Sequence, residues 1–190
     1  MSKWAGKTVI GLTGNIGTGK SVVRRMLEHL GAYGIDADAL AHRAIAKGAP
    51  GYQQVVQMFG RWVLAADGQI DRARLGKVVF SDPQALAELE KIIHPLVDQA
   101  IDILVRRATQ PVVVIEAIKL LEVGLGKKCD SIWVPYAPAQ EQAARLEQKA
   151  VEKLAKLPEL SKGATDAEPD RKRSVIEEAL ARARAQRAKG

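Results

Sequence analysis

Three glycines, a lysine and a serine lie close together near the start of the chain, in the run Gly14, Asn15, Ile16, Gly17, Thr18, Gly19, Lys20 and Ser21. The run matches the pattern G-x-x-x-x-G-K-S/T, in which successive backbone N–H groups surround phosphate oxygens. Glycine permits the backbone angles and the close approach that such a loop requires. The lysine supplies a positive charge for the outer phosphates, and the serine hydroxyl can bind Mg²⁺. The pattern predicts a site for a nucleoside triphosphate, formed by these eight residues and the following Val22.

Two acids, Asp36 and Asp38, follow a short predicted strand at 32–35. In an extended segment, side chains two residues apart point to the same side. A carboxylate near a phosphate site could orient an acceptor hydroxyl or accept its proton. Aspartate is also a favoured N-cap of a helix. The sequence leaves a catalytic acid and a helix cap as equal alternatives at these positions.

A third acid, Glu116, ends the clearest strand in the chain, predicted at 112–115. An acid at such a strand end can hold Mg²⁺ or a water bound to it, as the Walker B carboxylate does. Ser21 and Glu116 are therefore the predicted metal ligands. The alternative is an ordinary solvated acid at the end of a strand.

Basic and imidazole side chains supply candidate contacts for an anionic acceptor. Arg72 and Lys77 lie on a predicted amphipathic helix at 71–80, and His94 precedes Pro95 inside a longer helical stretch. Such charges usually form a solvated helix face, and a single histidine is more often structural than functional. An anionic substrate would nevertheless need charges of this kind.

Hydrophobic periodicity and glycine or proline stops place the elements that must position these residues. Strands are predicted at 8–13, 32–35, 112–115 and 131–135, and helices at 21–30, 39–46, 52–59, 71–80 and 83–105, with a further helix beginning at 120–124 and a break or kink at Pro95. Strands that alternate with helices predict an α/β fold with a parallel sheet. Ligands of such sheets bind at the carboxyl ends of the strands, where Gly14, Asp38 and Glu116 fall. Beyond these elements, 157–169 is predicted to be a loop and 174–189 a basic helix.

Composition narrows the class of protein. The chain has 190 residues, 47% of them hydrophobic and 27% charged, which is typical of one globular domain. The formal net charge of +7 suits phosphorylated ligands, but no RNP-type aromatic pattern or zinc-ligand spacing indicates a nucleic-acid partner. No apolar run approaches the roughly 20 residues that cross a bilayer. A single cysteine, Cys129, excludes an internal disulfide, and we expect a cytoplasmic location; the sequence makes no prediction of the oligomeric state.

Four blocks in order carry a resemblance to a known family. They are GLTGNIGTGKS at 11–21, LGAYGIDAD at 30–38 followed by His42, DGQIDRARLGKVVFSD at 67–82, and LEKIIHPLV at 89–97. Together they resemble dephospho-CoA kinases, over about residues 9–146. The resemblance implies transfer of the γ-phosphoryl group of ATP to the ribose 3′-hydroxyl of dephospho-CoA, which is the last step of CoA biosynthesis.

The resemblance also implies roles for individual residues. ATP and Mg²⁺ would bind at 14–21, with Lys20, Asp38 and Arg145 as the catalytic residues. Asp38 would orient the ribose hydroxyl or accept its proton. The substrate-binding candidates are Asp36, His42, Arg72, Lys77, His94 and Glu116. The implied fold is a three-layer α/β/α P-loop fold with a core at 1–38 and 108–146, a helical CoA-side domain at 39–107, and a mainly helical lid or tail at 147–190.

The resemblance ends after Arg145 and Leu146, because the R-D pair, the lid arginines and the last strand of the family have no recognisable counterpart. Two alternatives follow from this departure. One is a nucleotide-binding scaffold, natural or engineered, whose lid was replaced or lost and which has little or no turnover. The weaker one is another P-loop nucleoside or nucleotide kinase, which would prefer a nucleoside-type acceptor.

Overall fold

The structure is a computed structural model that describes residues 3–160 together with 174, 177 and 181. The chain divides into two compact units. The first comprises Met1–Thr13 and Ser21–Trp133, and the second comprises Gly14–Lys20 and Val134–Gly190. The predicted basic helix at 174–189 and most of the predicted loop at 157–169 lie outside the described residues.

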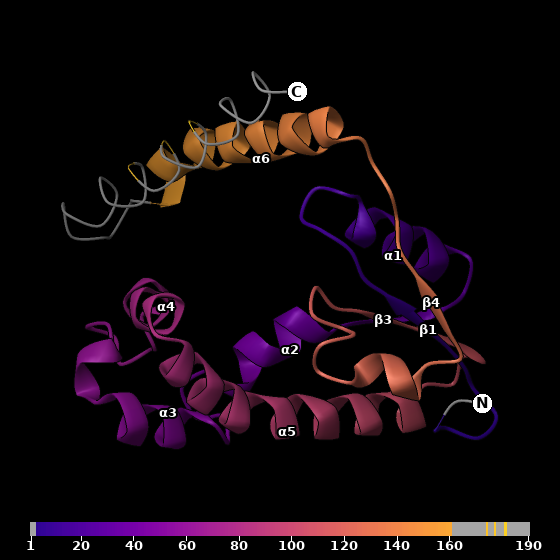
Figure 1. The fold of residues 1–190 in the computed structure, drawn as a ribbon, viewed down its shortest axis with the longest axis horizontal. Helices are drawn as coiled ribbons and strands as arrows, with labels where there is room; N and C mark the ends of the chain where they lie inside the picture. Colours follow the sequence, from indigo (N-terminus) through magenta and orange to yellow (C-terminus); the bar gives the residue numbers. More distant parts are fainter. Residues whose placement is uncertain (1–2, 161–173, 175–176, 178–180, 182–190) are drawn as a thin grey trace. The chain divides into compact units, whose positions relative to one another are not determined.

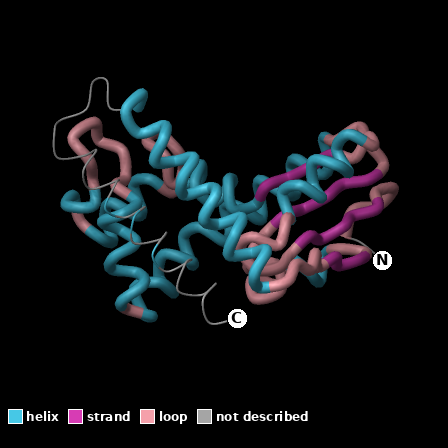
Figure 2. Tube along the Cα trace, turned by 90° about the horizontal axis from the view of Figure 1, so that it is seen from above, coloured by secondary structure: helices cyan, strands magenta, loops and turns pink. Residues whose placement is uncertain are grey.

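A four-stranded parallel sheet forms the centre of the first unit (Figures 1 and 2). Its strands are β1 (Thr8–Leu12), β2 (Tyr33–Asp36), β3 (Val112–Glu116) and β4 (Ser131–Trp133), in the spatial order β2-β3-β1-β4. The register pairs Glu116 with Asp36 on one side and with Leu12 on the other. The carboxyl ends of β1, β2 and β3 therefore lie level at one edge of the sheet, as the sequence predicted for its candidate site.

Helices cover both faces of this sheet. On one face, Ile10, Leu12 and Val114 pack against side chains of α1 (Lys20–His29). On the other face, Val9, Val113 and Ile115 share a core with residues of α5 (Pro83–Arg107). Residues that alternate along β1 and β3 thus face opposite layers, as a period of two requires. The predicted three-layer α/β/α fold with a parallel sheet is confirmed.

The regular structure between β2 and β3 is helical, apart from one isolated antiparallel bridge between Leu64 and Ile70. It contains α2 (Ala37–Ala44), α3 (Tyr52–Phe59), a 3₁₀ helix η1 (Arg61–Val63), α4 (Arg72–Ser81) and the long α5. Aspartates directly before α4 and α5 accept hydrogen bonds from first-turn N–H groups, which explains where these helices begin. The helices enclose a second hydrophobic cluster, made of Ile45, Val55, Val63, Leu75, Val79, Leu89 and Ile92. That these helices form a separate acceptor-binding domain stays a prediction.

The second unit joins the glycine-rich loop Gly14–Lys20 to α6 (Ala139–Leu160). The backbone of α6 lies against this loop, because a Cβ atom added at Gly17 would stand 3.0 Å from the carbonyl oxygen of Gln142. Gly17 also has a φ of 86°, an angle that residues with a side chain rarely adopt. Glycine at this position is therefore required both by the backbone angle and by the approach of the helix.

Four local predictions were wrong. The predicted break at Pro95 is absent, because Ile92 and Val97 anchor α5 in hydrophobic clusters on either side of the proline; the alternative, a kink there, stays a prediction. No helix begins at 120–124, where Gly124 takes a left-handed conformation and only a 3₁₀ helix, η2 (Leu125–Lys128), follows. The chain leaves the extended conformation after Asp36, where α2 begins. Asp36 and Asp38 therefore do not lie on one side of the same strand. Residues 157–160, the start of the predicted loop, are helical, since α6 continues to Leu160.

Gly11 provides a test of the packing under β1. A Cβ atom at Gly11 would lie 2.6 Å from Cδ2 of the buried Leu120 and 3.0 Å from Sγ of Cys129. We expect Gly11→Ala to lower the free energy of unfolding by about 1–3 kcal/mol through overpacking. Gly76→Ala is the matched control, because Gly76 is helical and its added Cβ would meet only ordinary contacts with Phe80. The control should be neutral or stabilise by about 0.5–1 kcal/mol. Equal melting temperatures of the two variants would contradict this packing.

Candidate active site

The carboxylate of Glu116 is the best-connected group at the carboxyl edge of the sheet. It is buried, with 5% relative exposure, at the end of β3. The hydroxyl of Ser21 donates to its Oε1 at 2.7 Å, and Nε of Arg24 donates to its Oε2 at 2.7 Å. A buried carboxylate requires such partners, because removing it from water is otherwise costly. Helix α1 therefore presents both a hydroxyl and a guanidinium to one acid of the central sheet.

Asp38 lies in the first turn of α2, close to the segment that follows β3. Its Oδ2 accepts a hydrogen bond from the backbone N–H of Ile118 at 3.2 Å. The carbonyl of Ile118 in turn accepts from the hydroxyl of the buried Thr13 at 3.0 Å. The peptide groups of Ile118 thus connect the segments that follow β1 and β2. This connection holds Asp38 at the same edge of the sheet as Glu116.

Asp36 has a different environment from Asp38. Its Oδ1 accepts from the N–H of Ala39 at 2.8 Å, which makes it the N-cap of α2. Of the two alternatives left open by the sequence, the helix cap therefore describes Asp36, whereas Asp38 lies beyond the cap.

Within the second unit, carbonyl oxygens of the glycine-rich loop bind the ammonium group of Lys20. This group is buried and donates to the carbonyl oxygens of Gly14 at 2.6 Å and Asn15 at 2.9 Å. The side chain of Arg145, from the second turn of α6, donates to the carbonyl oxygen of Gly17 at 3.1 Å and also bonds Glu141 at 3.0 Å. Two cationic side chains thus contact the loop that the sequence predicts to bind phosphates.

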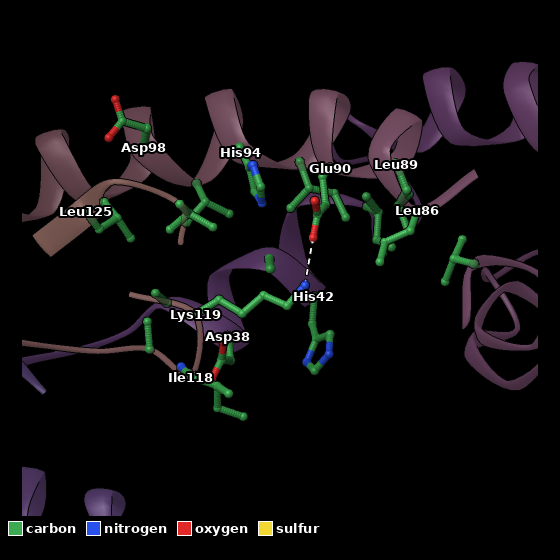
Figure 3. Close-up of a pocket in the computed structure, with 18 of the residues that line it drawn as sticks. Asp38, His42, Leu86, Leu89, Glu90, His94, Asp98, Ile118, Lys119 and Leu125 are labelled. Atoms are coloured by element: carbon green, nitrogen blue, oxygen red, sulfur yellow. Dashed lines mark hydrogen bonds and ion pairs between the residues drawn. The ribbon is translucent and has the colours of Figure 1, made fainter. Parts of the chain in front are cut away.

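A cavity of about 760 Å³ lies beside Asp38 in the first unit. Four of the predicted site residues line it: Asp38, His42, Arg72 and His94. Most of the remaining wall is aliphatic, with side chains from α2, α4 and α5. Figure 3 shows His94 and Glu90 pointing from α5 toward the wall that carries Asp38 and His42. The cavity therefore combines an apolar interior with a few polar groups, as is usual for a small-molecule site.

An ion pair spans this cavity between the segment after β3 and α5. Nζ of Lys119 lies 2.9 Å from Oε1 of Glu90 (Figure 3). The neighbouring carboxylate raises the pKa of Lys119 above its ordinary value. Lys128 makes a second ion pair with α5, through Asp98. These residues were not among the predicted site residues, because a pairing across 29 positions of sequence leaves no local pattern.

The remaining predicted residues lie outside this cavity. Lys77 is exposed on α4 and is absent from the cavity wall. Asp36 and Glu116 do not line it either. Arg24 is a site residue that the sequence reasoning missed. Its position three residues after Ser21, and so on the same side of α1, was the available signal.

The oxygen donors around Ser21 fit a magnesium ion. Because the hydroxyl proton of Ser21 points to Glu116, the lone pairs of its oxygen can face a cation. Among the described residues, no group of three or more His, Cys, Asp or Glu side chains could hold a metal by itself. Mg²⁺ commonly binds through one or two protein oxygens together with substrate phosphates, so a site completed by a nucleotide is the arrangement that fits.

The parallel sheet, the glycine-rich loop after its first strand and the acids at its carboxyl edge define the class of protein, an α/β P-loop protein of the kinase type. The family model for dephospho-CoA kinase matches residues 8–173. The dephospho-CoA kinase of Geobacter metallireducens is 45% identical over 144 residues, which cover 74% of this chain and 72% of the relative. That of Streptomyces avermitilis is 46% identical over 138 residues, which cover 72% and 67%. The chain belongs to the dephospho-CoA kinase family.

A solved structure agrees with this assignment. TT1252 from Thermus thermophilus matches with a TM-score of 0.69 at 31% identity, over 95% of this chain and 80% of that one. The match to the family model continues past residue 146, where the resemblance described from the sequence ends. Membership of the family supports the predicted kinase over a scaffold without turnover or a different P-loop kinase. Within the described part of the chain, no helix combines the length and apolar composition needed to cross a membrane.

His42 gives a prediction for the cavity. Partial burial, and then the positive charge of Arg72, lower its pKa below the ordinary 6.5, against the opposing charges of Asp38 and Asp36. The folded protein therefore binds this proton less readily than the unfolded chain, and the stability linked to His42 falls as the pH drops below 6.5. An NMR titration should give a midpoint for His42 below 6.5, assigned through His42→Gln.

Charge-removing variants on α4 check the cause of this shift. Arg72→Gln should raise the His42 midpoint, because it removes the nearby positive charge. Lys77→Gln removes an equal charge from an exposed position of the same helix and should leave the midpoint in place. A His42 midpoint at or above 6.5, or equal shifts in the two variants, would contradict the described environment.

Proposed function

We propose that the chain phosphorylates the 3′-hydroxyl of dephospho-CoA with ATP and yields CoA and ADP. The observation that carries the proposal is the position of Asp38, on the wall of a large cavity and at the same sheet edge as the Ser21–Glu116 pair. Membership of the dephospho-CoA kinase family supports the identity of both substrates. The reaction involves only small molecules, and neither nucleic acid nor a membrane takes part in it.

The nucleotide would bind at the glycine-rich loop, through residues 14–22. Lys20 and the loop N–H groups would neutralise the phosphates, and the N-terminal end of α1 favours negative charge there. Ser21, with Glu116 behind it, would hold Mg²⁺, which when bound neutralises charge that develops on the phosphate oxygens. Arg145 would add a positive charge from the helix that contacts the loop.

The acceptor would occupy the cavity beside Asp38. Dephospho-CoA has a long, largely uncharged arm and a negatively charged pyrophosphate. The aliphatic wall suits the first of these parts, and Arg72 and His94 suit the second. The ribose would then lie near Asp38, at the end of the cavity closest to the sheet edge. Asp36, Lys77 and Glu116 take no direct part in binding the acceptor in this arrangement.

The chemical step needs one proton acceptor and a stable orientation. The carboxylate of Asp38 would accept the proton of the ribose hydroxyl while the hydroxyl oxygen bonds to the γ-phosphorus atom. The bond between that phosphorus and the β–γ bridging oxygen breaks, and ADP leaves. The hydrogen bond from Ile118 to Asp38 fixes the carboxylate during this step. Positioning and charge neutralisation supply most of the catalysis in such reactions.

We also propose that the enzyme works in the cytoplasm. The single cysteine, Cys129, supports this, because burial raises its pKa to about 11 and leaves it as an unreactive thiol without a disulfide partner in the chain.

Replacement of Asp38 tests the proposed proton acceptor. In Asp38→Asn, the amide oxygen can still accept from the Ile118 N–H, but the side chain can no longer take a proton. We expect kcat for CoA formation to fall by roughly 10²- to 10⁴-fold with a nearly unchanged melting temperature. Asp67→Asn, in a surface turn where the oxygen likewise accepts a backbone N–H, should keep full activity.

The assay itself compares CoA formed from ATP, Mg²⁺ and dephospho-CoA with that formed by Lys20→Ala. Wild-type turnover at the level of Lys20→Ala would reject the proposed function. Turnover of Asp38→Asn equal to wild type would reject only the role of Asp38.

Arg145 tests the role of α6. Its guanidinium contacts the carbonyl oxygen of Gly17 within the loop. If Arg145 neutralises negative charge on the phosphoryl group during its transfer, Arg145→Met should lower kcat on the order of 10³-fold, as loss of such an arginine does in other phosphoryl transfers. Lys149→Met removes a charge one turn further along the exposed side of the same helix and should change kcat less than about twofold. Equal effects of the two variants would exclude a specific role for Arg145.

A further inference from the structure

Arg24 lies at the centre of a cluster of acids that joins α1 to the sheet. Its Nε is 2.7 Å from Oε2 of Glu116, its Nη1 is 2.6 Å from Oε1 of Glu28, and its Nη2 is 4.0 Å from Oδ2 of Asp36. The side chains of Arg24 and Glu116 are only 19% and 7% exposed. One guanidinium therefore faces carboxylates from α1, β2 and β3.

This arrangement restricts the orientation of Glu116. One carboxylate oxygen is held by Arg24 and the other by the hydroxyl of Ser21. A guanidinium that is itself held by Glu28 cannot follow a rotation of the Glu116 side chain without losing a contact. The carboxylate plane is thus fixed, and with it the direction in which the hydroxyl proton of Ser21 points.

We propose that Arg24 is a positioning residue for the metal–nucleotide complex, because it fixes Glu116 so that the Ser21 oxygen presents its lone pairs to a divalent cation bound by ATP. Arg24 touches neither the nucleotide nor the cation in this role and acts through Glu116. The inference rests on the proposed function only in taking ATP with Mg²⁺ as the ligand. It assigns no role to Arg24 in binding the acceptor.

The opposite effect of Arg24, competition with the cation for Glu116, is the physical alternative. The cluster argues against it, since a single guanidinium faces three carboxylates and the group keeps a net negative charge. Arg24 also occupies Oε2, whereas Ser21 occupies Oε1, so the guanidinium does not stand between the hydroxyl and a cation. Positioning and competition predict opposite changes in Mg²⁺ affinity, which makes them separable.

The first experiment measures binding without turnover. ATP is titrated calorimetrically at increasing Mg²⁺ in the absence of dephospho-CoA, for the wild type, Arg24→Met and Arg25→Met. Arg25 is the matched control, because it is the next residue on α1, is exposed, and bonds only the carbonyl oxygen of Ser21 among the contacts described. The Mg²⁺ concentration that gives half of the maximal increase in ATP affinity should rise about 10- to 100-fold in Arg24→Met, as for other residues that orient a metal ligand. ATP affinity in EDTA should be equal in all three proteins.

A double-mutant cycle separates positioning from general destabilisation. If Arg24 acts only through Glu116, Arg24→Met should add less than about twofold to the Mg²⁺ requirement of Glu116→Gln. Arg24→Lys should recover part of the loss, since an ammonium group can bond Glu116 but cannot also hold Glu28 in a fork. Melting temperatures of all variants show whether a loss of folding accompanies the change.

The outcomes separate this inference from the proposed function. Equal Mg²⁺ requirements of Arg24→Met and Arg25→Met overturn the inference, as do additive effects in the cycle, a lower Mg²⁺ requirement in Arg24→Met, or a wild type whose ATP affinity ignores Mg²⁺. A wild type whose Mg²⁺-dependent ATP binding is weakened by Arg24→Met, but which forms no CoA, leaves the inference standing and rejects the proposed function.

Discussion

A buried carboxylate at the end of the central strand is the constraint on which the site depends. Glu116 sits between Leu12 and Asp36 in the sheet register, where water cannot solvate it well. A buried acid that loses its partners costs several kcal/mol, roughly 3–5 when an ion pair is broken, so the fold has to supply them. Both partners come from α1, the helix that begins in the glycine-rich motif. The need to compensate the charge of Glu116 therefore fixes how α1 is rotated about its own axis relative to the sheet.

The same edge of the sheet holds the second half of the site by a different means. There the link is the backbone of Ile118, because its N–H donates to Asp38 and its C=O accepts from the hydroxyl of Thr13. The segments after β1, β2 and β3 are thereby tied together by hydrogen bonds to a neutral backbone and not by an ion pair. Parallel strands bring these ends level, and hydrogen bonds of ordinary length then define which side chain faces the cavity. Asp38 faces it, whereas Asp36, two residues earlier, ends as a helix cap.

The parts of the fold that local chemistry controls could be predicted from the sequence. The glycine pattern before Lys20 predicted the turn from strand to helix, and the hydrophobic periodicity predicted helices at 71–80 and 83–105, close to the bounds of α4 and α5. The predictions failed where tertiary packing decides. Pro95 does not break α5, because Ile92 and Val97 hold the helix in two separate clusters. The contact of Arg24 with Glu116 and the Lys119–Glu90 pair were missed for a related reason, since tertiary packing brings together partners that are far apart in sequence.

The contacts between α6 and the glycine-rich loop lie before Leu146, within the span over which the sequence resembles the family. The family match extends to residue 173, although its last recognisable block ends earlier. The contact needs a small residue in the loop, and it brings a cationic side chain of the helix to the loop. Gly17 accepts the backbone of α6 at Gln142, and Arg145, one turn later, donates to the carbonyl oxygen of Gly17. The other positions of such a helix are constrained mainly by helix propensity and solubility, which Ala, Lys, Glu and Gln satisfy in many combinations. The part of α6 after Leu146 can therefore vary in sequence while the contacts with the glycine-rich loop, made at Gln142 and Arg145, remain.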